Sequence, residues 1–292
     1  MKIKDINAIE ILDSRGVPTV SVEIELLSGD KARGEAPSGS STGSNEALEL
    51  RDNDPKRFNG KGVLTAVNNV NTIIRDAILD KEFESQKQFD DFLISLDGTE
   101  NKSKLGANAI LPCSIAFCKA AALRIGLEPF EYIGMIYWDR EYSKDKFHMP
   151  RPQILMMEGG KHGNWATDIQ EYMIVPKPNS FETFSEILKA SSEIFYCIEN
   201  ILDEKGYSTG VGYEGAFAPR EIKSNKEALD IIMDGIQKAG YTEKFDMALD
   251  IASSELFNND TQRYELKREN KSVNAQEWIT LQSEWYSQYP VF

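Results

Sequence analysis

From residue 151 onward, short apolar segments alternate with long amphipathic ones, and this alternation constrains the fold more than any other feature. Apolar side chains recur at helical spacing over 180–204, 224–239 and 273–287. Strands that alternate with helices in this way are typical of parallel strands joined by crossover helices. The sequence therefore predicts strands at 153–157, 171–176, 209–215, 246–252 and 289–292.

Polar residues or glycines follow several of these predicted strands. Glu158, Glu214 and Asp250 each stand at or next to the end of one. Carboxylates at the carboxyl ends of successive strands are what the active site of a (β/α)₈ barrel requires. A complete barrel needs roughly 250 residues, whereas 151–292 supplies about half of that length. We therefore expect an incomplete α/β barrel over 151–292.

The residues before this region have a different pattern and predict a small α+β domain over 1–135. Alternating apolar residues over 3–36, interrupted by turn residues, predict a three-stranded antiparallel meander. The small polar residues and glycines of 37–44 predict a mobile loop. Residues 136–150 are charged and aromatic, and we expect them to link the two domains.

Helices are predicted over most of the remaining N-terminal domain. Val63, Val67, Val70, Ile74 and Ile78 have helical spacing and predict a helix over 61–79. A second apolar stripe follows at Phe89, Phe92, Leu93 and Leu96, and a third, nearly all-apolar helix is expected over 106–125. A fourth helix is expected over 45–52, with Thr42 or Ser44 as its cap.

Net charge, the longest apolar run and the cysteines bear on the partners and the cellular compartment of the protein. The chain has 47 acidic and 33 basic residues, a net charge of −14, which repels nucleic acids and anionic membrane surfaces. The apolar run 107–123 is interrupted by polar residues, so we interpret it as a buried helix and not as a membrane span. Three cysteines without a C-x-x-C pair predict reduced thiols in a cytoplasmic protein without a signal peptide.

The segment 210–215, GVGYEG, has the G-x-G-x-x-G spacing of a dinucleotide-binding loop. Such a loop must open directly into a helix, but Pro219 follows and helical periodicity begins only near Ser224. Glu214 inside the loop would also repel a pyrophosphate group. We therefore interpret the segment as a strand end that points Glu214 into a cavity, where glycines allow close backbone approach.

The order of several long motifs resembles that of the enolase family along essentially the whole chain. The most specific are DGTENKSKLGANA, GGKHGNWATDIQEYMIVP, VGYEGAFAP and ALDIASSE, preceded by ILDSRGVPTVSVE and PSGSSTGSNEALELRD. The resemblance implies an α+β N-terminal capping domain followed by an unusual α/β barrel. It further implies a glycolytic, Mg²⁺-dependent lyase that interconverts 2-phosphoglycerate and phosphoenolpyruvate as a homo-oligomer.

The resemblance also assigns roles to individual residues. Glu214, Glu171 and His162 match residues around the reacting part of the substrate, and Gln170 accompanies Glu171 at the end of the second barrel strand. Asp250 matches the first of three carboxylate ligands of one Mg²⁺, and Ser41 matches a loop ligand of a second Mg²⁺. Elementary chemistry agrees, because proton abstraction beside a carboxylate builds a highly charged enolate that divalent cations stabilise.

This sequence departs from the family pattern in two ways. The resemblance implies two further metal-binding acids and a general-base lysine after the residues printed here, so we expect activity to need a complementary C-terminal fragment. Within the chain, the substituted positions include Val17, Pro112-Cys113, Glu158, Tyr213 and Ala216. A proline at 112 is expected to kink its helix. An alternative hypothesis is therefore a catalytically inactive binding or scaffold protein.

Overall fold

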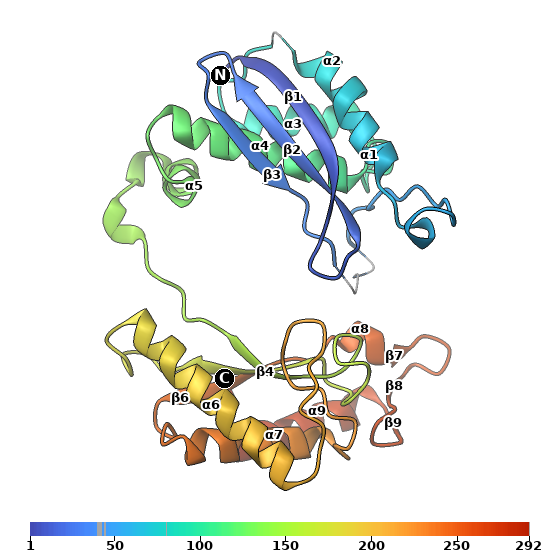
Figure 1. Cartoon of the computed structure of the whole chain (residues 1–292), viewed down its shortest axis with the longest axis vertical. Coiled ribbons are helices and arrows are strands. Elements are labelled where there is room, and N and C mark those ends of the chain that lie inside the picture. The colour runs from blue at the N-terminus through green and yellow to red at the C-terminus, as the bar shows by residue number, and fades with distance from the viewer. Residues whose placement is uncertain (40–42, 44, 80, 292) are drawn as a thin grey trace. The chain divides into compact units, whose positions relative to one another are not determined.

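A computed structural model describes residues 1–292 except 40–42, 44, 80 and 292 (Figure 1). The chain divides into two compact units, Met1–His148 and Met149–Phe292. Ser41 and the predicted caps Thr42 and Ser44 lie outside the described residues. An N-terminal α+β unit precedes a partial α/β barrel, so the predicted fold class is confirmed.

The N-terminal sheet is the predicted antiparallel meander. Its strands are β1 (Ile3–Leu12), β2 (Pro18–Leu26) and β3 (Lys31–Glu35), in the order β1-β2-β3 with antiparallel pairing throughout. Alternate residues of β2 such as Val20, Val22 and Ile24 are fully buried. They pack against the helices that lie behind the sheet in Figure 1.

The helices of this unit follow the apolar spacing closely. The predicted helix over 61–79 is present as α1 (Leu64–Asn69), a π-helical turn (Val70–Ile74) and α2 (Arg75–Ile78). The other two are α3 (Gln86–Asp97) and α4 (Ala107–Arg124), and α5 (Pro129–Trp138) follows. Pro112 lies inside α4 without ending it, and the adjacent Cys113 is fully buried.

The predicted helix over 45–52 is wrong. The backbone of this segment forms hydrogen bonds with distant residues: the Leu48 N–H donates to the Asn101 carbonyl at 2.8 Å, and the Ala107 N–H donates to the Leu48 carbonyl at 2.8 Å. Asn108 holds Leu50 on both sides, because its side chain accepts from the Leu50 N–H and donates to the Leu50 carbonyl. Non-local partners therefore use the groups that a helix would have paired internally.

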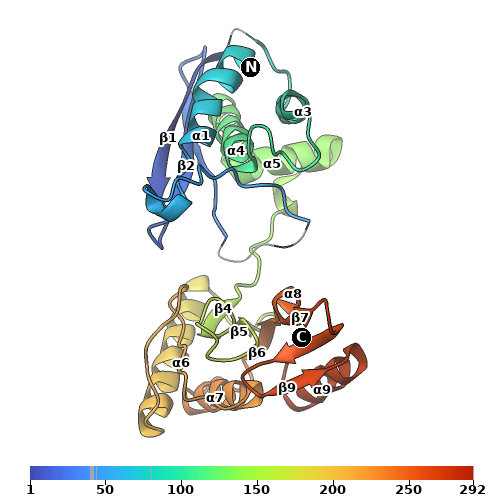
Figure 2. The same cartoon turned by 90° about the vertical axis from the view of Figure 1, so that its right-hand side faces the viewer.

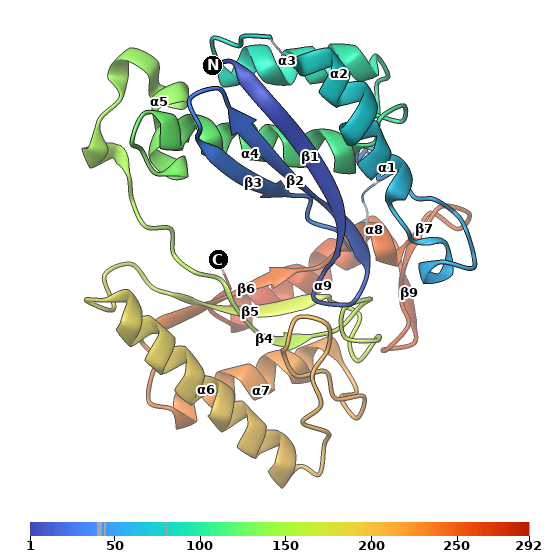
Figure 3. The same cartoon turned by 45° about the horizontal axis from the view of Figure 1, so that its top comes forward.

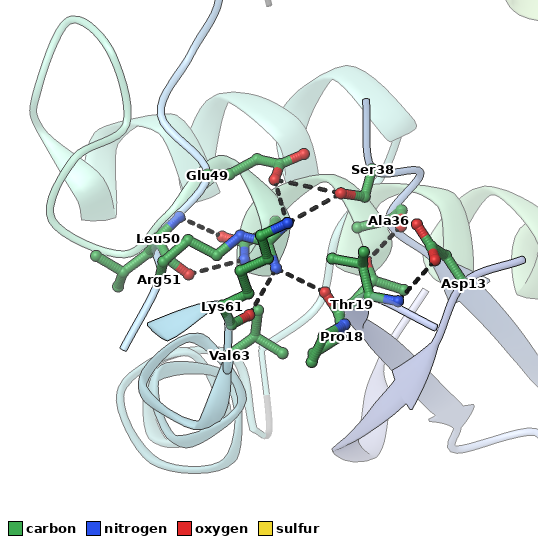
Figure 4. Close-up of polar contacts among 12 residues, drawn as sticks. Asp13, Pro18, Thr19, Ala36, Ser38, Glu49, Leu50, Arg51, Lys61 and Val63 are labelled. Carbon is green, nitrogen blue, oxygen red and sulfur yellow. Dashed lines mark hydrogen bonds and ion pairs between the residues drawn. The ribbon is translucent and has the colours of Figure 1, made fainter. Parts of the chain in front are cut away.

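Arg51 ties this extended segment to the sheet (Figure 4). Its guanidinium donates to the carbonyls of Pro18 at 2.6 Å and Lys61 at 2.9 Å. It also donates to the Ser38 hydroxyl at 2.9 Å and the Glu49 carboxylate at 2.5 Å. One planar, five-donor group therefore fixes the start of β2 and both ends of the segment 38–61.

Two carboxylates from outside helix α1 cap its N-terminus, because the side chain of the N-cap residue, Val63, cannot accept a hydrogen bond. Asp52 accepts from the backbone N–H groups of Leu64 and Thr65, each at 2.8 Å. Glu10 on β1 accepts from the Val63 N–H at 2.9 Å and forms a bidentate pair with Arg57. The Arg57 hydrogen bonds lower the pKa of Glu10, with burial opposing and the Val63 N–H adding to the effect.

Replacing Glu10 with glutamine is expected to destabilise the N-terminal unit by about 1–2 kcal/mol near neutral pH, toward the low end because Arg57 is partly exposed. A lowered pKa means that this contribution is present above the unfolded value of 4.5 and is lost as pH falls through the folded value. Urea unfolding across the acid range measures the difference. Glu23→Gln is the control, because its pair with Arg33 is exposed on both sides. A difference that persists in strong acid would contradict the assignment.

Residues 136–150, expected to be a linker, carry structure of their own up to His148. They include the end of α5 and two short 3-10 helices, Asp139–Glu141 and Lys144–Lys146. The Trp138 and Phe147 rings pack edge to face with centroids 4.9 Å apart. A Cβ at Gly134 would collide with both rings, so glycine there permits the aromatic packing.

The central sheet of the C-terminal unit contains β4 (Ile154–Glu158), β5 (Glu171–Pro176) and β6 (Phe245–Asp250) in the order β4-β5-β6 (Figure 3). Both pairings are antiparallel, so the predicted parallel arrangement is wrong for these three strands. The reason is that β4 and β5 are joined by the loop 159–170, which contains no helix to carry the chain back.

The predicted helices of this unit are confirmed as α6 (Phe184–Glu204), α7 (Asn225–Lys238) and α9 (Ala275–Gln288). Helices α6 and α7 approach closely because residue 235 is glycine, where a Cβ would lie 2.5 Å from Ile198 Cγ1. The sequence reading missed α8 (Ser253–Leu256) and a small antiparallel sheet that lies by α9 in Figure 2. Its strands are β7 (Phe257–Asn258), β8 (Arg263–Leu266) and β9 (Lys271–Val273).

Two predicted strands are reduced to isolated bridges. Over 209–215 there is no strand, although Val211 bridges Phe217, and Phe217 in turn bridges Met157 of β4 in parallel. At the other end, Val291 bridges Met247 of β6 in parallel. Among the described residues no single helix has the length and composition to cross a membrane, although α4 and 129–141, bent by 94°, meet those criteria together.

Candidate active site

The direction of β5 gathers three carboxylates at one edge of the sheet. Because β5 is antiparallel to both neighbours, its first residue, Glu171, lies opposite the last residues of β4 and β6. Those last residues are Glu158 and Asp250, and each is the register partner of Glu171. The family resemblance implied that Glu171 stands at the end of a strand, but it is the first residue of β5, as the predicted strand 171–176 has it, and the reversed direction of β5 aligns the three acids.

His162 joins this edge from the loop between β4 and β5. Its side chain is buried, with 8% of the residue exposed. Its Nδ1 lies 3.4 Å from Glu171 Oε1 and 3.2 Å from Glu214 Oε1, without the alignment of a hydrogen bond. Donor atoms of the three residues all lie within 4.8 Å of one another, close enough to share one ligand. The structure therefore brings together the three residues predicted to be catalytic.

Glu214 lies on a tight loop between α6 and α7, and not at the end of a barrel strand as predicted. The Gly212 N–H donates to the Ala216 carbonyl at 3.0 Å, which closes the loop. Gly215 has a φ of +83°, a conformation that favours glycine. The Tyr213 N–H donates to the His162 carbonyl at 3.1 Å, so the loop lies directly against the loop that carries His162.

The charges at this edge are strongly coupled. Burial raises the pKa of Glu171, and the nearby carboxylates of Glu214 and Asp250 raise it further. Burial also raises the pKa of Glu158, although two backbone N–H groups oppose this. A divalent cation would relieve the repulsion, and carboxylate oxygens are the ligands that Mg²⁺ prefers. The residues present therefore fit such an ion, with the exposed Asp250 as an available oxygen donor.

Of the two remaining predicted site residues, Gln170 lies beside the site and Ser41 lies outside the described residues. Gln170 is buried beside Glu171, and within the described part of the chain its Oε1 accepts no hydrogen bond. Such a buried, unpaired oxygen is available to a bound ligand. Ser41 lies outside the described residues, so its predicted role as a metal ligand stays a prediction. The three cysteines are free, as expected.

A buried polar network behind the site was missed by the sequence reading. Its centre is Asn225, the first residue of α7, which is fully buried. The Asn225 side chain accepts from the N–H of Asp168 at 2.9 Å and from the Tyr172 hydroxyl at 3.1 Å. It donates to Asp168 Oδ2 at 3.1 Å and to Glu269 Oε1 at 3.0 Å. The network fixes the end of the loop 159–170 immediately before Gln170 and Glu171.

Replacing Asn225 with alanine is expected to destabilise the C-terminal unit by about 2–3 kcal/mol, because several buried donors and acceptors lose their partner at once. Urea unfolding followed by the fluorescence of the buried Trp278 and Trp285 measures this loss. The exposed Asp234 on the same helix provides the control, Asp234→Ala, which should change stability by less than about 0.5 kcal/mol. Equal effects of the two substitutions would contradict the role of the network.

The fold and this edge define a class of protein: an α+β domain followed by an α/β barrel whose ββαα start collects acidic side chains. Comparison with known families identifies the class more closely. The family "Enolase, N-terminal domain" matches residues 3–133, and "Enolase, C-terminal TIM barrel domain" matches residues 146–292. The chain belongs to the enolase family.

Two curated relatives give the extent of the similarity. The chain is 46% identical over 293 aligned positions to Enolase 1 of Chlorobaculum tepidum, covering 100% of this chain and 66% of that protein. It is 43% identical to Enolase 2 of Pseudomonas syringae pv. tomato, covering 99% of this chain and again 66% of the relative. The chain thus spans just under two thirds of the length of these relatives.

Proposed function

We propose that the chain carries one side of the active site of an Mg²⁺-dependent lyase that interconverts 2-phosphoglycerate and phosphoenolpyruvate. The observation that carries this proposal is the convergence of Glu171, Glu214 and His162 beside Asp250. Membership of the enolase family and the retained motif residues support it. The names of two relatives, Enolase 1 and Enolase 2, suggest the activity.

In the proposed reaction, this side of the site handles the hydroxyl group that leaves. A departing hydroxyl must gain a proton, and a carboxyl whose pKa is raised is better able to supply one than an ordinary carboxylate. The surroundings of Glu171 favour its protonated form, so we assign it a proton-holding role shared with Glu214. His162, between the two, would orient the substrate, and Gln170 Oε1 would accept one of its hydrogen bonds.

We propose that the negative charge of the enolate is stabilised on the side of the site that binds Mg²⁺. Mg²⁺, when bound, would stabilise the enolate by its charge. Asp250 is the proposed ligand among the described residues, and Ser41 is the proposed loop ligand. The further metal-binding acids and the general base implied by the family resemblance would come from a complementary C-terminal segment. We also propose a cytoplasmic homo-oligomer, in keeping with a glycolytic reaction and three free thiols.

A completion experiment tests this proposal. The chain is mixed with the separately produced C-terminal segment of Enolase 1 of Chlorobaculum tepidum, Mg²⁺ and 2-phosphoglycerate, and phosphoenolpyruvate absorbance is followed. We expect turnover that requires both polypeptides. A stable complex of the two that shows no turnover at any mixing ratio would contradict the proposal. That result would favour the alternative, an inactive enolase-like binding protein.

A further inference from the structure

Glu158, at the end of β4, is buried beneath the loop that carries Glu214. Only 1% of its surface is exposed. One carboxylate oxygen, Oε1, accepts from the Ala216 N–H at 3.0 Å and from the Glu214 N–H at 3.2 Å. The other oxygen, Oε2, lies 3.4 Å from the Glu214 nitrogen. The Glu158 carboxylate therefore lies inside the loop 212–216 and accepts hydrogen bonds from its backbone.

The shape of the loop is adapted to this carboxylate. A Cβ at Gly212 would lie 2.6 Å from Glu158 Oε2 and 2.7 Å from the His162 carbonyl, so only glycine leaves room for both. The backbone of Glu158 is also tied to the loop, because its N–H donates to the Phe217 carbonyl at 3.0 Å. Phe217 stacks on Phe195 of α6 with ring centroids 4.2 Å apart, which anchors the far side of the loop to the core.

The described residues between Gly210 and Ala218 form isolated bridges but no regular strand or helix that would determine the position of Glu214. Its backbone is held by short-range hydrogen bonds, by the His162 carbonyl and by Glu158. The N–H groups of Glu214 and Ala216, both turned toward one anion, form a small anion-binding concavity. Among the residues that the structure describes, the Glu158 carboxylate is the group that accepts from the N–H groups of Glu214 and Ala216.

We propose that Glu158 is a positioning residue: its carboxylate holds the backbone of 212–216 so that Glu214 lies against His162 and Glu171. The charged or titratable groups that face Glu158 are Glu214 and His162 from the two loops and Glu171 across β5. The inference deepens the proposed function, on which its kinetic consequence rests. Its structural consequence for the loop is independent of any activity.

Amide NMR of the ¹⁵N-labelled full chain tests the structural consequence. Glu158→Gln keeps the shape but replaces a charged acceptor with a neutral amide, and Glu158→Leu removes the acceptor altogether. We expect the amide resonances of Glu214 and Ala216 to move in both variants, with hydrogen exchange accelerating by roughly tenfold or more in Glu158→Leu and less in Glu158→Gln. Glu255→Gln, at the exposed ion pair with Lys161, is the matched control.

A second variant perturbs the same contact from the opposite side. Gly212→Ala places a methyl group against the Glu158 carboxylate and should move the same two resonances, whereas Gly210→Ala, where only the Ser208 hydroxyl is near, should not. In the completed protein, Glu158→Gln should lower kcat by roughly tenfold and leave KM nearly unchanged. Unchanged Glu214 and Ala216 resonances in Glu158→Leu and Gly212→Ala would overturn the inference. Absent turnover together with shifted resonances would instead reject the proposed function and leave the positioning role intact.

Discussion

Glu171→Gln is expected to lower kcat of the completed protein by about 10²–10⁴-fold, the range typical of a lost proton-transfer group. Glutamine preserves the size of the side chain and its hydrogen-bonding oxygen but can neither hold nor release a proton. The fold should not suffer. Burial and two neighbouring carboxylates disfavour the ionised form of Glu171, so removing this charge should leave the free energy of unfolding unchanged or raise it near neutral pH.

The control for Glu171→Gln is the same substitution at Glu243, an exposed position on the turn between α7 and β6. Steady-state kinetics and urea unfolding of both variants separate an effect on chemistry from an effect on folding. We expect Glu243→Gln to match the wild type in both measurements. A kcat within about threefold of the wild type for Glu171→Gln would contradict the proton-holding role.

Asp250→Asn is expected to weaken Mg²⁺ binding by more than about 100-fold. Even the loss of a residue that only supports a metal ligand typically lowers metal affinity by about 10–100-fold. An asparagine oxygen is a poorer ligand for a hard cation than a carboxylate oxygen. The fold should persist, because Asp250 is exposed and its one described hydrogen bond, from the Ala252 N–H at 2.9 Å, can also be accepted by an amide oxygen. Mg²⁺ titration of the completed protein's activity measures the change.

Asp246 offers a matched control on the same strand. It lies toward the other end of β6, opposite Val175, and its carboxylate is 3.9 Å from Lys177. Asp246→Asn removes an equal charge from the same strand but should leave the Mg²⁺ requirement unchanged. If both substitutions raised the required Mg²⁺ concentration equally, the effect would come from net charge and not from ligation at Asp250.

Local patterning predicted much of the fold because the buried faces are regular. Alternation over β1 and β2 and helical spacing over α3 and α6 report directly which side chains face a core. Helix α4 continues past Pro112 to Arg124, and the kink expected at this proline stays a prediction. The helix predicted over 45–52 was wrong because the partners of this segment, Asn101 and Asn108, are distant in sequence and leave no local signal.

Strand direction was the main error in the C-terminal unit. The absence of a helix between β4 and β5 was visible in the sequence, since residues 159–170 contain two adjacent glycines and no helical spacing. A twelve-residue connection without a helix favours an antiparallel return, and that return is what aligns Glu158, Glu171 and Asp250. The lack of helical spacing in that loop is thus the sequence signal for the alignment of these three acids.

The candidate site was predicted mainly through the family resemblance. His162, Glu171 and Glu214 came from quoted motifs, and the structure brings them together. Glu158 was predicted at a strand end and noted as a departure from the family pattern, but its contacts were not predicted, because nothing in a sequence shows which backbone N–H groups a buried carboxylate will bind. Asn225 was hidden for the same reason, although it immediately follows the cap Ser224 of a predicted helix.

The most direct test of the central claim is the initial rate of phosphoenolpyruvate formation from 2-phosphoglycerate by the wild-type chain completed with a C-terminal enolase segment. The rate is measured with Mg²⁺ present, after chelation and after Mg²⁺ is restored. We predict turnover that disappears on chelation and returns with the metal. A folded, completed protein that forms no phosphoenolpyruvate, or whose rate is indifferent to chelation, would contradict the assignment of this edge to Mg²⁺-dependent elimination.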